Sequence, residues 1–416
     1  MSISTFAPSD KAGEFLRAES ELIIEQARQE KADRNKNLGD PIALKGTPID
    51  VRVRGDYAWT AENGHIIRKS DLKVGETVQI YQGHAGPVTS IAFCDSTQGS
   101  SDAKYLISCS WDKTIKIWDT DTKALISSTP AHSDFVKTLL VLPAQRLLVS
   151  GGSDKVVRFW DLSSPHSSEP LTSVGSILSH TRPIEALEVH PEAFASPDGP
   201  FILFTSDTMG VIRAWEMCRI DGGRPTWKAS PKADLHHHRT GVTQLKFGDG
   251  HLWSASTDET VQVLPYPPSV SQLRPYQLVT EKRAVKAILP LSLERQLGVG
   301  SYPYLLTATE DVIRVYDVSS LSEPEFVREV EGHWHDVTRL QLWLRTLDDG
   351  SGKEVWIVSA GLDKTLRRWP LADLLQPSAR EKPQSLGTSS SVPSVPKPSA
   401  LTEEEERELA ELMDED

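Results

Sequence analysis

A short pattern occurs three times in this chain, and it constrains the fold more than any other feature. It reads SCSWDKTIKIWD from Ser108, SGGSDKVVRFWD from Ser150 and SAGLDKTLRRW from Ser359. In each copy an Asp follows a Ser by four residues and precedes a Trp by six. The β-branched residues in these segments predict two short strands joined by a tight turn. Recurrence of such a unit indicates a repeat architecture.

A histidine precedes each copy, and a valine follows that histidine by four residues. The pairs are His84 and Val88, His132 and Val136, and His333 and Val337. This set of His, Ser, Asp and Trp resembles the WD-repeat family, whose blades are four-stranded antiparallel sheets around a central channel. The resemblance implies three structural tetrads: His84, Ser108, Asp112 and Trp118; His132, Ser150, Asp154 and Trp160; His333, Ser359, Asp363 and Trp369.

Each tetrad is expected to link two strands and a turn through hydrogen bonds between buried polar groups. We call this hydrogen-bonded set the lock of its blade. Ser, His and Asp also form nucleophile systems in hydrolases. Recurrence of the same trio at blade spacing favours the structural role. We therefore expect no catalytic residue, no cofactor and no enzymatic activity.

Four further copies are degenerate. The first, from Ile49 to about Tyr81, has Thr47 in place of His and Ser70 in place of Trp. The fourth begins at His180 and ends at Trp215, with Met209 where the Asp should be and Asp207 two residues early, so its tetrad is expected to be absent. The fifth has His238, Ser254, Asp258 and Leu264. The sixth has Glu281, Thr307, Asp311 and Tyr316, and its lock is expected to be broken.

Seven copies predict an all-β, seven-bladed WD-repeat β-propeller over residues 41–372. After Trp369 the chain has supplied only three strands of its last blade. The apolar run PIALK, from Pro41 to Lys45, is therefore expected to provide the missing outer strand and to close the ring.

Both ends extend beyond the predicted ring. Residues 1–40 contain an expected helix between about Ser9 and Lys36, whose apolar stripe is Phe15, Leu16, Leu22, Ile23 and Ala27. The stripe either packs on the propeller's flank or binds a partner helix, and the sequence leaves both open. Residues 373–400 are rich in Pro and Ser and are expected to be a disordered linker.

Residues 401–416 read LTEEEERELAELMDED. They contain nine acidic residues and one Arg, so they carry eight of the chain's thirteen formal negative charges. Thr402 and Glu405 form a capping-box pattern, and Leu409, Leu412 and Met413 form a short apolar stripe. So short a helix is marginal alone, which favours an acidic helical tail that orders on a partner; a solvating tail without a partner is the alternative.

Composition narrows the compartment and the ligand classes. Cys94, Cys109 and Cys218 have spacings that suggest neither a disulfide framework nor a zinc site. No apolar run approaches about eighteen residues and no secretion signal is visible, so we expect an intracellular protein of the cytoplasm or nucleus with no membrane contact. His236, His237 and His238 are adjacent on an extended chain and cannot readily converge on one metal ion. The acidic balance makes nucleic acid an unlikely main ligand.

Loops at the channel mouth are the candidate binding surface, by the geometry that the resemblance implies. The positions after each His and before each turn Asp hold Trp111, Asp134, Arg182, Arg239, Lys282, Arg283, Trp334 and His335. Arg182, Arg239 and Arg283 fall in successive blades. Arg and Trp are enriched at interface hot spots, although ordinary surface charge gives the same pattern.

These features predict a non-enzymatic scaffold or adaptor subunit of an intracellular multiprotein complex, which binds other proteins through the channel-mouth loops and through Leu409 and Leu412. The alternative is a substrate receptor of a cullin-type ubiquitin ligase. Some WD-repeat receptors of that class carry a basic residue two positions beyond the Trp–Asp pair. Here those positions are Asp121 and Ser163, which disfavours the alternative.

Overall fold

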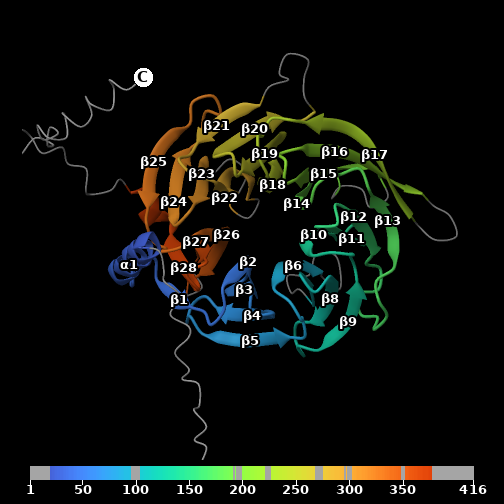
Figure 1. Ribbon diagram of the computed structural model, residues 1–416, viewed down its shortest axis with the longest axis horizontal. Helices are drawn as coiled ribbons and strands as arrows, with labels where there is room; N and C mark the ends of the chain where they lie inside the picture. The colour runs from blue at the N-terminus through green and yellow to red at the C-terminus, as the bar shows by residue number, and fades with distance from the viewer. Residues whose placement is uncertain are drawn as a thin grey trace, which may run out of the picture. The chain divides into compact units, whose positions relative to one another are not determined.

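The computed structural model describes residues 19–94, 104–190, 193, 199–220, 226–267, 275–294, 297, 302–347 and 352–376. The chain divides into two compact units, residues 1–377 and 378–416, and every described residue belongs to the first. This unit contains seven four-stranded antiparallel sheets arranged as a ring (Figure 1). The predicted seven-bladed β-propeller is confirmed.

Each blade has the same strand order, from the channel outward. The first three blades are β2 (Pro48–Arg54), β3 (Tyr57–Glu62), β4 (Ile66–Asp71) and β5 (Thr77–Gln82); β6 (Val88–Cys94), β7 (Tyr105–Ser110), β8 (Thr114–Asp119) and β9 (Leu125–Pro130); and β10 (Val136–Leu142), β11 (Leu147–Gly152), β12 (Val157–Asp161) and β13 (Ser173–Ile177).

The next three blades are β14 (Ile184–Val189), β15 (Phe201–Asp207), β16 (Ile212–Ile220) and β17 (Thr226–Leu235); β18 (Val242–Gly248), β19 (His251–Ser256), β20 (Thr260–Pro265) and β21 (Tyr276–Thr280); and β22 (Val285–Pro290), β23 (Tyr304–Thr309), β24 (Val312–Asp317) and β25 (Glu325–Val330). The 3₁₀ turn η2 (Leu291–Leu293) follows β22.

The seventh blade combines the two ends of the ring. It contains β26 (Val337–Thr346), β27 (Lys353–Gly361) and β28 (Thr365–Pro370), and its outer strand is β1 (Pro41–Ala43). Ile42 of β1 lies opposite Leu366 of β28, as the count of strands predicted. Closure by β1 is therefore confirmed.

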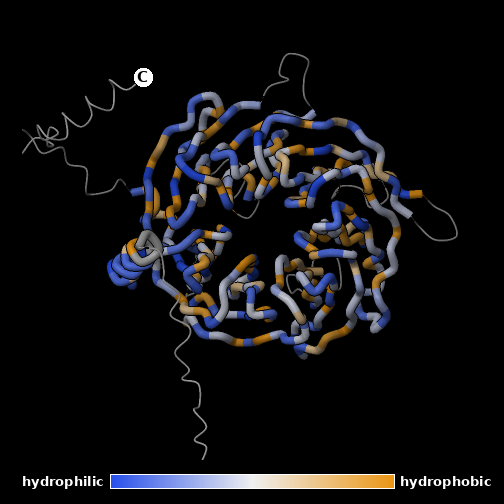
Figure 2. The backbone as a smooth tube through the Cα atoms, in the orientation of Figure 1, coloured by the Kyte–Doolittle hydropathy of each residue, from blue (hydrophilic) through white to orange (hydrophobic). Residues whose placement is uncertain are grey.

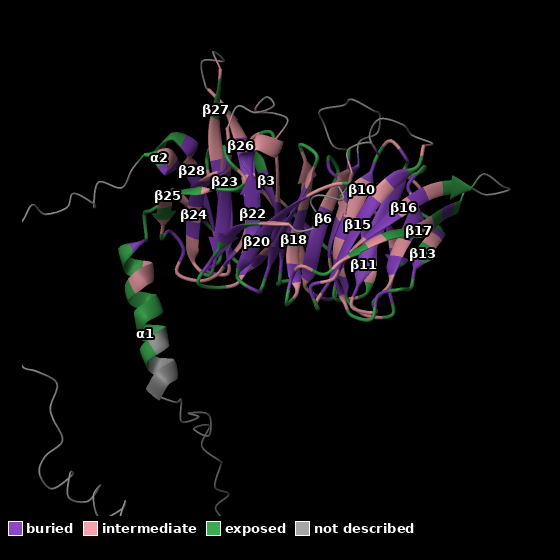
Figure 3. Cartoon of the chain, turned by 90° about the horizontal axis from the view of Figure 1, so that it is seen from above, coloured by how far each residue is buried: buried purple, intermediate pink, exposed green. Residues whose placement is uncertain are grey.

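The core lies between neighbouring blades. One cluster of buried side chains joins Trp59 and Ile67 of the first blade to Ile91, Leu106 and Trp118 of the second. Hydrophobic and hydrophilic residues mix along the strands (Figure 2), and buried residues fill the blades while exposed ones gather at the two faces (Figure 3). Each blade covers the apolar side of the next, so the ring as a whole forms the folding unit.

Polar contacts near the channel also tie the blades together. The Thr89 hydroxyl on β6 donates to the carbonyl of Val136 on β10 at 2.6 Å, and Thr243 on β18 donates to that of Val285 on β22 at 2.8 Å. Asp50 on β2 accepts from Nε of Arg339 at 3.1 Å and from the Ser90 hydroxyl at 3.1 Å. Buried Asp50 thus connects the seventh, first and second blades.

Helix α1 (Glu19–Arg34) precedes the ring and extends away from it (Figure 3). Ile23 is 61% exposed and Ala27 is also exposed, so these two members of the predicted stripe do not pack on the propeller's flank. Phe15 and Leu16 lie outside the described residues. The C-terminal end of α1 is anchored: Nζ of Lys31 lies 2.7 Å from Oδ2 of Asp311, and the amide of Asn35 donates to the carbonyl of Glu331.

A second, short helix, α2 (Leu371–Leu375), follows β28 directly. Its Leu371 and Leu374 are buried in the core cluster of the sixth and seventh blades. Residues 377–416, with Leu409 and Leu412, lie outside the described part of the chain.

Candidate functional site

The three predicted tetrads form the same hydrogen-bonded chain in three blades. In the second blade Nδ1 of His84 lies 2.7 Å from Oδ2 of Asp112, and Nε2 lies 2.8 Å from the Ser108 hydroxyl, which also accepts the Trp118 indole N–H at 2.8 Å. The third and seventh blades repeat these contacts with distances of 2.7–3.0 Å.

In each of these three blades the Asp carboxylate of the tetrad also accepts a hydrogen bond from the tight turn. Oδ1 of Asp112 accepts the backbone N–H and the hydroxyl of Thr114, and Oδ2 also accepts the N–H of Ala85. Burial alone would raise the pKa of Asp112, but hydrogen bonds from His84 and Thr114 outweigh it and hold that pKa below its usual range. Burial lowers the pKa of His84, so its imidazole is neutral, Nδ1–H donates to Asp112 and Nε2 accepts the Ser108 hydroxyl.

The tetrad has the connectivity of a hydrolase triad but not its accessibility. The Ser108 side chain is fully buried and its oxygen already accepts the Trp118 N–H. A nucleophile must reach its substrate, and this hydroxyl does not. The arrangement is suited to holding strands together.

The fourth blade has a complete lock, so the prediction that its tetrad is absent was wrong. Nδ1 of His180 lies 3.2 Å from Oδ2 of Asp207, and Nε2 lies 2.7 Å from the Thr205 hydroxyl. The Trp215 indole donates to the same hydroxyl at 2.8 Å. Asp207 is the last residue of β15, two positions earlier than in other blades, yet its Oδ1 still accepts the N–H of Met209. The carboxylate thus reaches the histidine from the strand end and also accepts N–H groups of the turn.

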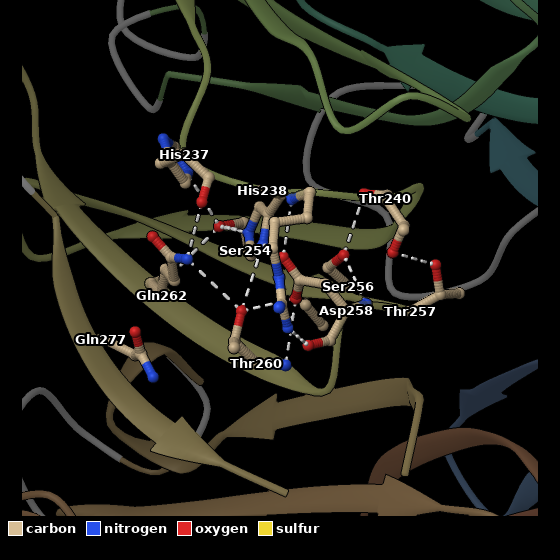
Figure 4. Close-up of polar contacts among 12 residues, drawn as sticks. His237, His238, Thr240, Ser254, Ser256, Thr257, Asp258, Thr260, Gln262 and Gln277 are labelled. Carbon is tan, nitrogen blue, oxygen red and sulfur yellow. Dashed lines mark hydrogen bonds and ion pairs between the residues drawn. The ribbon is translucent and has the colours of Figure 1, made fainter.

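The fifth blade keeps His238, Ser254 and Asp258 in contact (Figure 4). His238 lies 3.0 Å from Asp258 and 2.7 Å from the Ser254 hydroxyl. With Leu264 at the Trp position, the Ser254 hydroxyl lies 3.3 Å from the carbonyl oxygen of Gln262. The Gln262 carbonyl accepts and so does not replace the indole donor, but Nε2 of His237 also lies 3.3 Å from the Ser254 hydroxyl.

The sixth blade has a rebuilt lock rather than the broken one predicted. Glu281 stands where His stands elsewhere, and its Oε1 accepts the Thr307 hydroxyl at 2.7 Å and the Tyr316 hydroxyl at 3.0 Å. Its Oε2 accepts from Arg314 at 2.6 Å. Asp311, expected at the turn, instead pairs with Lys31 of α1. Burial and the nearby Glu281 carboxylate raise the pKa of the Tyr316 phenol, which therefore stays protonated as a donor.

The first blade also has a lock, which the sequence reading missed. Arg68 donates from Nε to Oε1 of Glu62 at 2.6 Å and from its terminal nitrogen to Oε2 at 3.1 Å. The Thr60 hydroxyl donates to the same carboxylate at 3.1 Å. Glu62 is fully buried and Arg68 is 3% exposed. Neither Thr47 nor Ser70 takes part in this lock.

One strand position explains how these replacements arise. The residue on the third strand that lies directly opposite the lock's Ser or Thr is basic in six blades and Gln in the fifth: Arg68, Lys116, Arg158, Arg213, Gln262, Arg314 and Arg367. In four blades this cation lies beside the lock's carboxylate: Arg68 and Arg314 donate to it, and Arg158 and Arg367 lie 3.8 Å and 3.9 Å from it. In the first and sixth blades, which lack the His, Arg68 and Arg314 instead bind the carboxylate of the lock. The paired signal in sequence is a Thr, a Glu and an Arg in one blade.

Removing a lock carboxylate is expected to destabilise the fold. Asp207→Ala, like Asp112→Ala and Asp154→Ala, leaves buried donors unpaired and should lower the free energy of unfolding by about 1–3 kcal/mol. Met209→Ala is the control, because the Met209 side chain is 53% exposed. Urea unfolding measures both. Equal midpoints for Asp207→Ala and Met209→Ala would show that Asp207 does not lock the fourth blade.

The locks also predict acid sensitivity. Burial lowers the pKa of His84, His132, His180 and His238. The unfolded chain therefore binds more protons than the folded one below a pH of about 6.5, and stability falls as pH decreases, by at most about 1.4 kcal/mol per pH unit for each His. The lowered pKa of Asp112, Asp154, Asp258 and Asp363 adds a further loss below a pH of about 4. Urea midpoints measured from pH 8 to pH 5 should decrease, and a flat profile would contradict neutral, buried histidines.

The predicted binding residues lie on the loops at the lock end of the blades. Arg182, Arg239, Lys282 and Arg283 are exposed, and Arg283 is 3.4 Å from Glu310. Arg239 also donates to the carbonyl of Asp258 at 3.2 Å. Trp334 and His335 are half-buried and contact each other, with ring centroids 6.2 Å apart. Leu409 and Leu412 lie outside the described residues.

Trp111 and Phe135 form an exposed aromatic pair on the same face. Their rings stack with centroids 4.9 Å apart and an interplanar angle of 16°, and they are 46% and 39% exposed. Asp134, also predicted at this surface, accepts the N–H of Phe135. The sequence reading missed Phe135, although a large aromatic residue stands there at the third position after His132.

A metal-binding cluster and a membrane-spanning helix are both absent from the described residues. Among the described residues no group of three His, Cys, Asp or Glu side chains could hold a metal ion. His237 and His238 are instead used by the fifth blade, where both contact the Ser254 hydroxyl. In the described part of the chain, neither helix has the length and apolar character that crossing a membrane requires.

Comparison with known proteins places the repeats in a family. The model for "WD domain, G-beta repeat" matches residues 75–119 and 123–161. An uncharacterized WD repeat-containing protein of Schizosaccharomyces pombe is 27% identical over 96% of this chain and 97% of its own length.

Two further relatives match over shorter stretches. The nuclear distribution protein PAC1 of Coccidioides posadasii is 30% identical over 28% of this chain, which is 24% of that protein. The ribosome biogenesis protein ytm1 of Botryotinia fuckeliana is 25% identical over 65% of this chain and 58% of its own length.

Proposed function

Because this chain is a WD-repeat β-propeller protein, we propose that it is a non-enzymatic scaffold or adaptor subunit of an intracellular multiprotein complex. It binds other proteins through the channel-mouth loops and acts in the cytoplasm or nucleus. One observation carries the proposal. Arg182, Arg239 and Arg283 are exposed on loops of successive blades. Arg239 also touches the lock residue Asp258, through its backbone N–H and through a side-chain bond to the Asp258 carbonyl.

The rest of the molecule supports a binding role. The Ser, His and Asp groups of the locks hold the strands of each blade together. The channel-mouth loops are therefore attached to a rigid framework that fixes the positions of their side chains. Similarity to a nuclear distribution protein and to a ribosome biogenesis protein is consistent with work inside the cell. We assign the terminal Leu409 and Leu412 to a second contact with a partner.

Replacing Arg182, Arg239 and Arg283 together by Ala is expected to abolish recovery of the principal partner. Exposed charges contribute little to folding, so the melting temperature should change by less than about 2 °C. The measurement is affinity purification from native cells followed by quantitative mass spectrometry. The matched control replaces Lys104, Lys123 and Lys353 by Ala. These lysines are exposed at the opposite edge of the blades, and their replacement removes the same number of positive charges.

The outcome separates the candidate functions. A stable set of non-ligase subunits that the arginine variant loses and the lysine variant keeps is the expected result. Recovery of a cullin and its adaptor would favour the substrate-receptor alternative. Unchanged recovery with the arginine variant would rule out these three residues as the binding surface.

A further inference from the structure

The channel mouth has two chemically different parts. The second and third blades carry the exposed aromatic pair Trp111 and Phe135, stacked at 4.9 Å. The fourth to sixth blades carry the exposed Arg182, Arg239 and Arg283. Met209, 53% exposed on the fourth blade, follows Arg182 in sequence and adds an apolar side chain to the basic part. A surface with this division suits a ligand that is itself both apolar and charged.

The aromatic pair is held by its backbone and is not part of the core. The N–H of Trp111 donates to the carbonyl of Pro87 at 3.0 Å, and the N–H of Ser153 donates to the carbonyl of Phe135 at 2.8 Å. Both residues therefore sit on fixed turns, while about two fifths of each side chain is exposed. Preorganised aromatic side chains lose little entropy on binding and are typical anchors of interfaces.

The exposed charges next to the pair belong to lysines. Lys113 and Lys155 follow the lock aspartates of the second and third blades, and both are exposed at turns with φ of 69°. The nearest carboxylates are half-buried: Asp112 and Asp154 bind their neutral histidines, and Asp134 accepts the N–H of Phe135. Lysines thus supply the exposed charge next to the aromatic pair.

Two carboxylates elsewhere on this face are paired with cations. Glu310 lies 3.4 Å from Arg283, and Asp311 lies 2.7 Å from Lys31. Nδ1 of His335 accepts the N–H of Asp336, so this nitrogen does not donate to the Asp336 carboxylate. Glu259 is exposed. The chain as a whole carries a formal charge of −13. The exposed cations on this face, Arg182, Arg239, Lys113 and Lys155, attract acidic partners.

We propose that the channel mouth binds an acidic peptide segment of a partner protein that carries one large apolar side chain. This inference rests on the proposed function and names its ligand. The apolar side chain packs against Trp111 and Phe135, and the carboxylates of the segment contact Arg182 and Arg239. A single-stranded nucleic acid is also anionic, but the two rings stack on each other and leave no gap for a base between them.

The test begins with selection of peptides. A phage-displayed library of random twelve-residue peptides is selected on the immobilised full chain and, in parallel, on the Trp111→Ala, Phe135→Ala double variant. The expected peptides carry net negative charge and one Leu, Met, Phe or Trp, and the double variant should not enrich them. Because both aromatic residues are exposed, the double variant should melt like the parent chain, which shows that it is folded.

Affinities then test each half of the mouth. Fluorescence anisotropy with the best labelled peptide should show at least a tenfold weaker affinity for the double variant and for Arg239→Glu, with a steeper salt dependence for the parent chain. Changing the peptide's large apolar residue to Ala should weaken binding to the parent about tenfold. Tyr57→Ala is the control, since Tyr57 is an exposed aromatic residue at the start of β3, at the opposite end of the blade.

Several results would overturn the inference. These are failure to enrich any peptide, enrichment of neutral or basic peptides, or equal binding by the double variant. Tighter binding of a labelled fifteen-nucleotide single strand, lost in the double variant, would assign the surface to nucleic acid. If the peptide selection and the affinity measurements contradict the inference while the triple arginine variant still loses its partner, the ligand class is wrong and the proposed function stands. If the partner is also retained, the proposed function fails.

Discussion

Replacing Arg68 by methionine is expected to lower the free energy of unfolding by about 3–5 kcal/mol, because it leaves the fully buried Glu62 carboxylate without its cation. Arg68 makes two hydrogen bonds to that carboxylate and one, at 3.2 Å, to the Thr77 hydroxyl on β5. Its loss therefore removes contacts that join three strands of the first blade. Urea unfolding of the full chain, followed by intrinsic fluorescence, measures the change.

A double variant provides the control. Arg68→Met with Glu62→Leu removes both charges, so it leaves no unpaired ion and should lose less stability than Arg68→Met alone. If the single variant unfolds at the same urea concentration as the parent, the Glu62–Arg68 pair does not replace the histidine lock of the first blade.

Deletion of residues 41–46 should cost at least about 4 kcal/mol, far more than a six-residue segment at a chain end usually does. Ile42 and Leu44 are 4% and 8% exposed in a core cluster that spans the seventh and first blades, and loss of each such side chain costs about 2–5 kcal/mol. The deletion also disturbs the adjacent contacts between Arg368 on β28 and Asp40. Nη2 of Arg368 lies 2.6 Å from the Asp40 carboxylate, and its Nε donates to the Asp40 carbonyl at 3.2 Å. Thermal and urea unfolding should both show the loss.

A longer deletion serves as its control. Removing residues 19–30 takes out twelve residues of α1, where the described side chains of Ile23 and of residues 25–30 are exposed. We expect a change below about 1 kcal/mol, because the side chains that the structure describes in this segment are exposed. Equal costs for the two deletions would mean that β1 does not close the ring.

The ring could be predicted from sequence because its strongest signals are local. In each intact repeat Ser, Asp and Trp lie within eleven residues of one hairpin, so spacing alone brings them together. The count of strands also required an outer strand from the other end of the chain. That strand is β1, and it pairs with β28.

The degenerate blades show where local spacing stops being informative. Asp207 reaches His180 from a strand end, although its spacing from Trp215 differs from that in the other repeats. Glu281 and Arg314 form one lock across 33 residues, and only the fold reveals that they face each other. A search of the sequence for the tetrad at fixed spacings does not find the locks of these two blades.

The sequence by itself determined the repeat, the number of blades, the closing strand and the residues of the three intact locks, because hydrogen-bonding groups in a hairpin have fixed offsets. Only the tertiary structure decided which groups replace a missing His, that Phe135 completes an aromatic pair with Trp111, and that the apolar side chain of Ile23 on α1 stays exposed. These depend on contacts between strands and blades that are far apart in the chain. A buried carboxylate accepts whichever cation or hydroxyl the sheet places beside it, so chemistry is conserved there while residue identity is not.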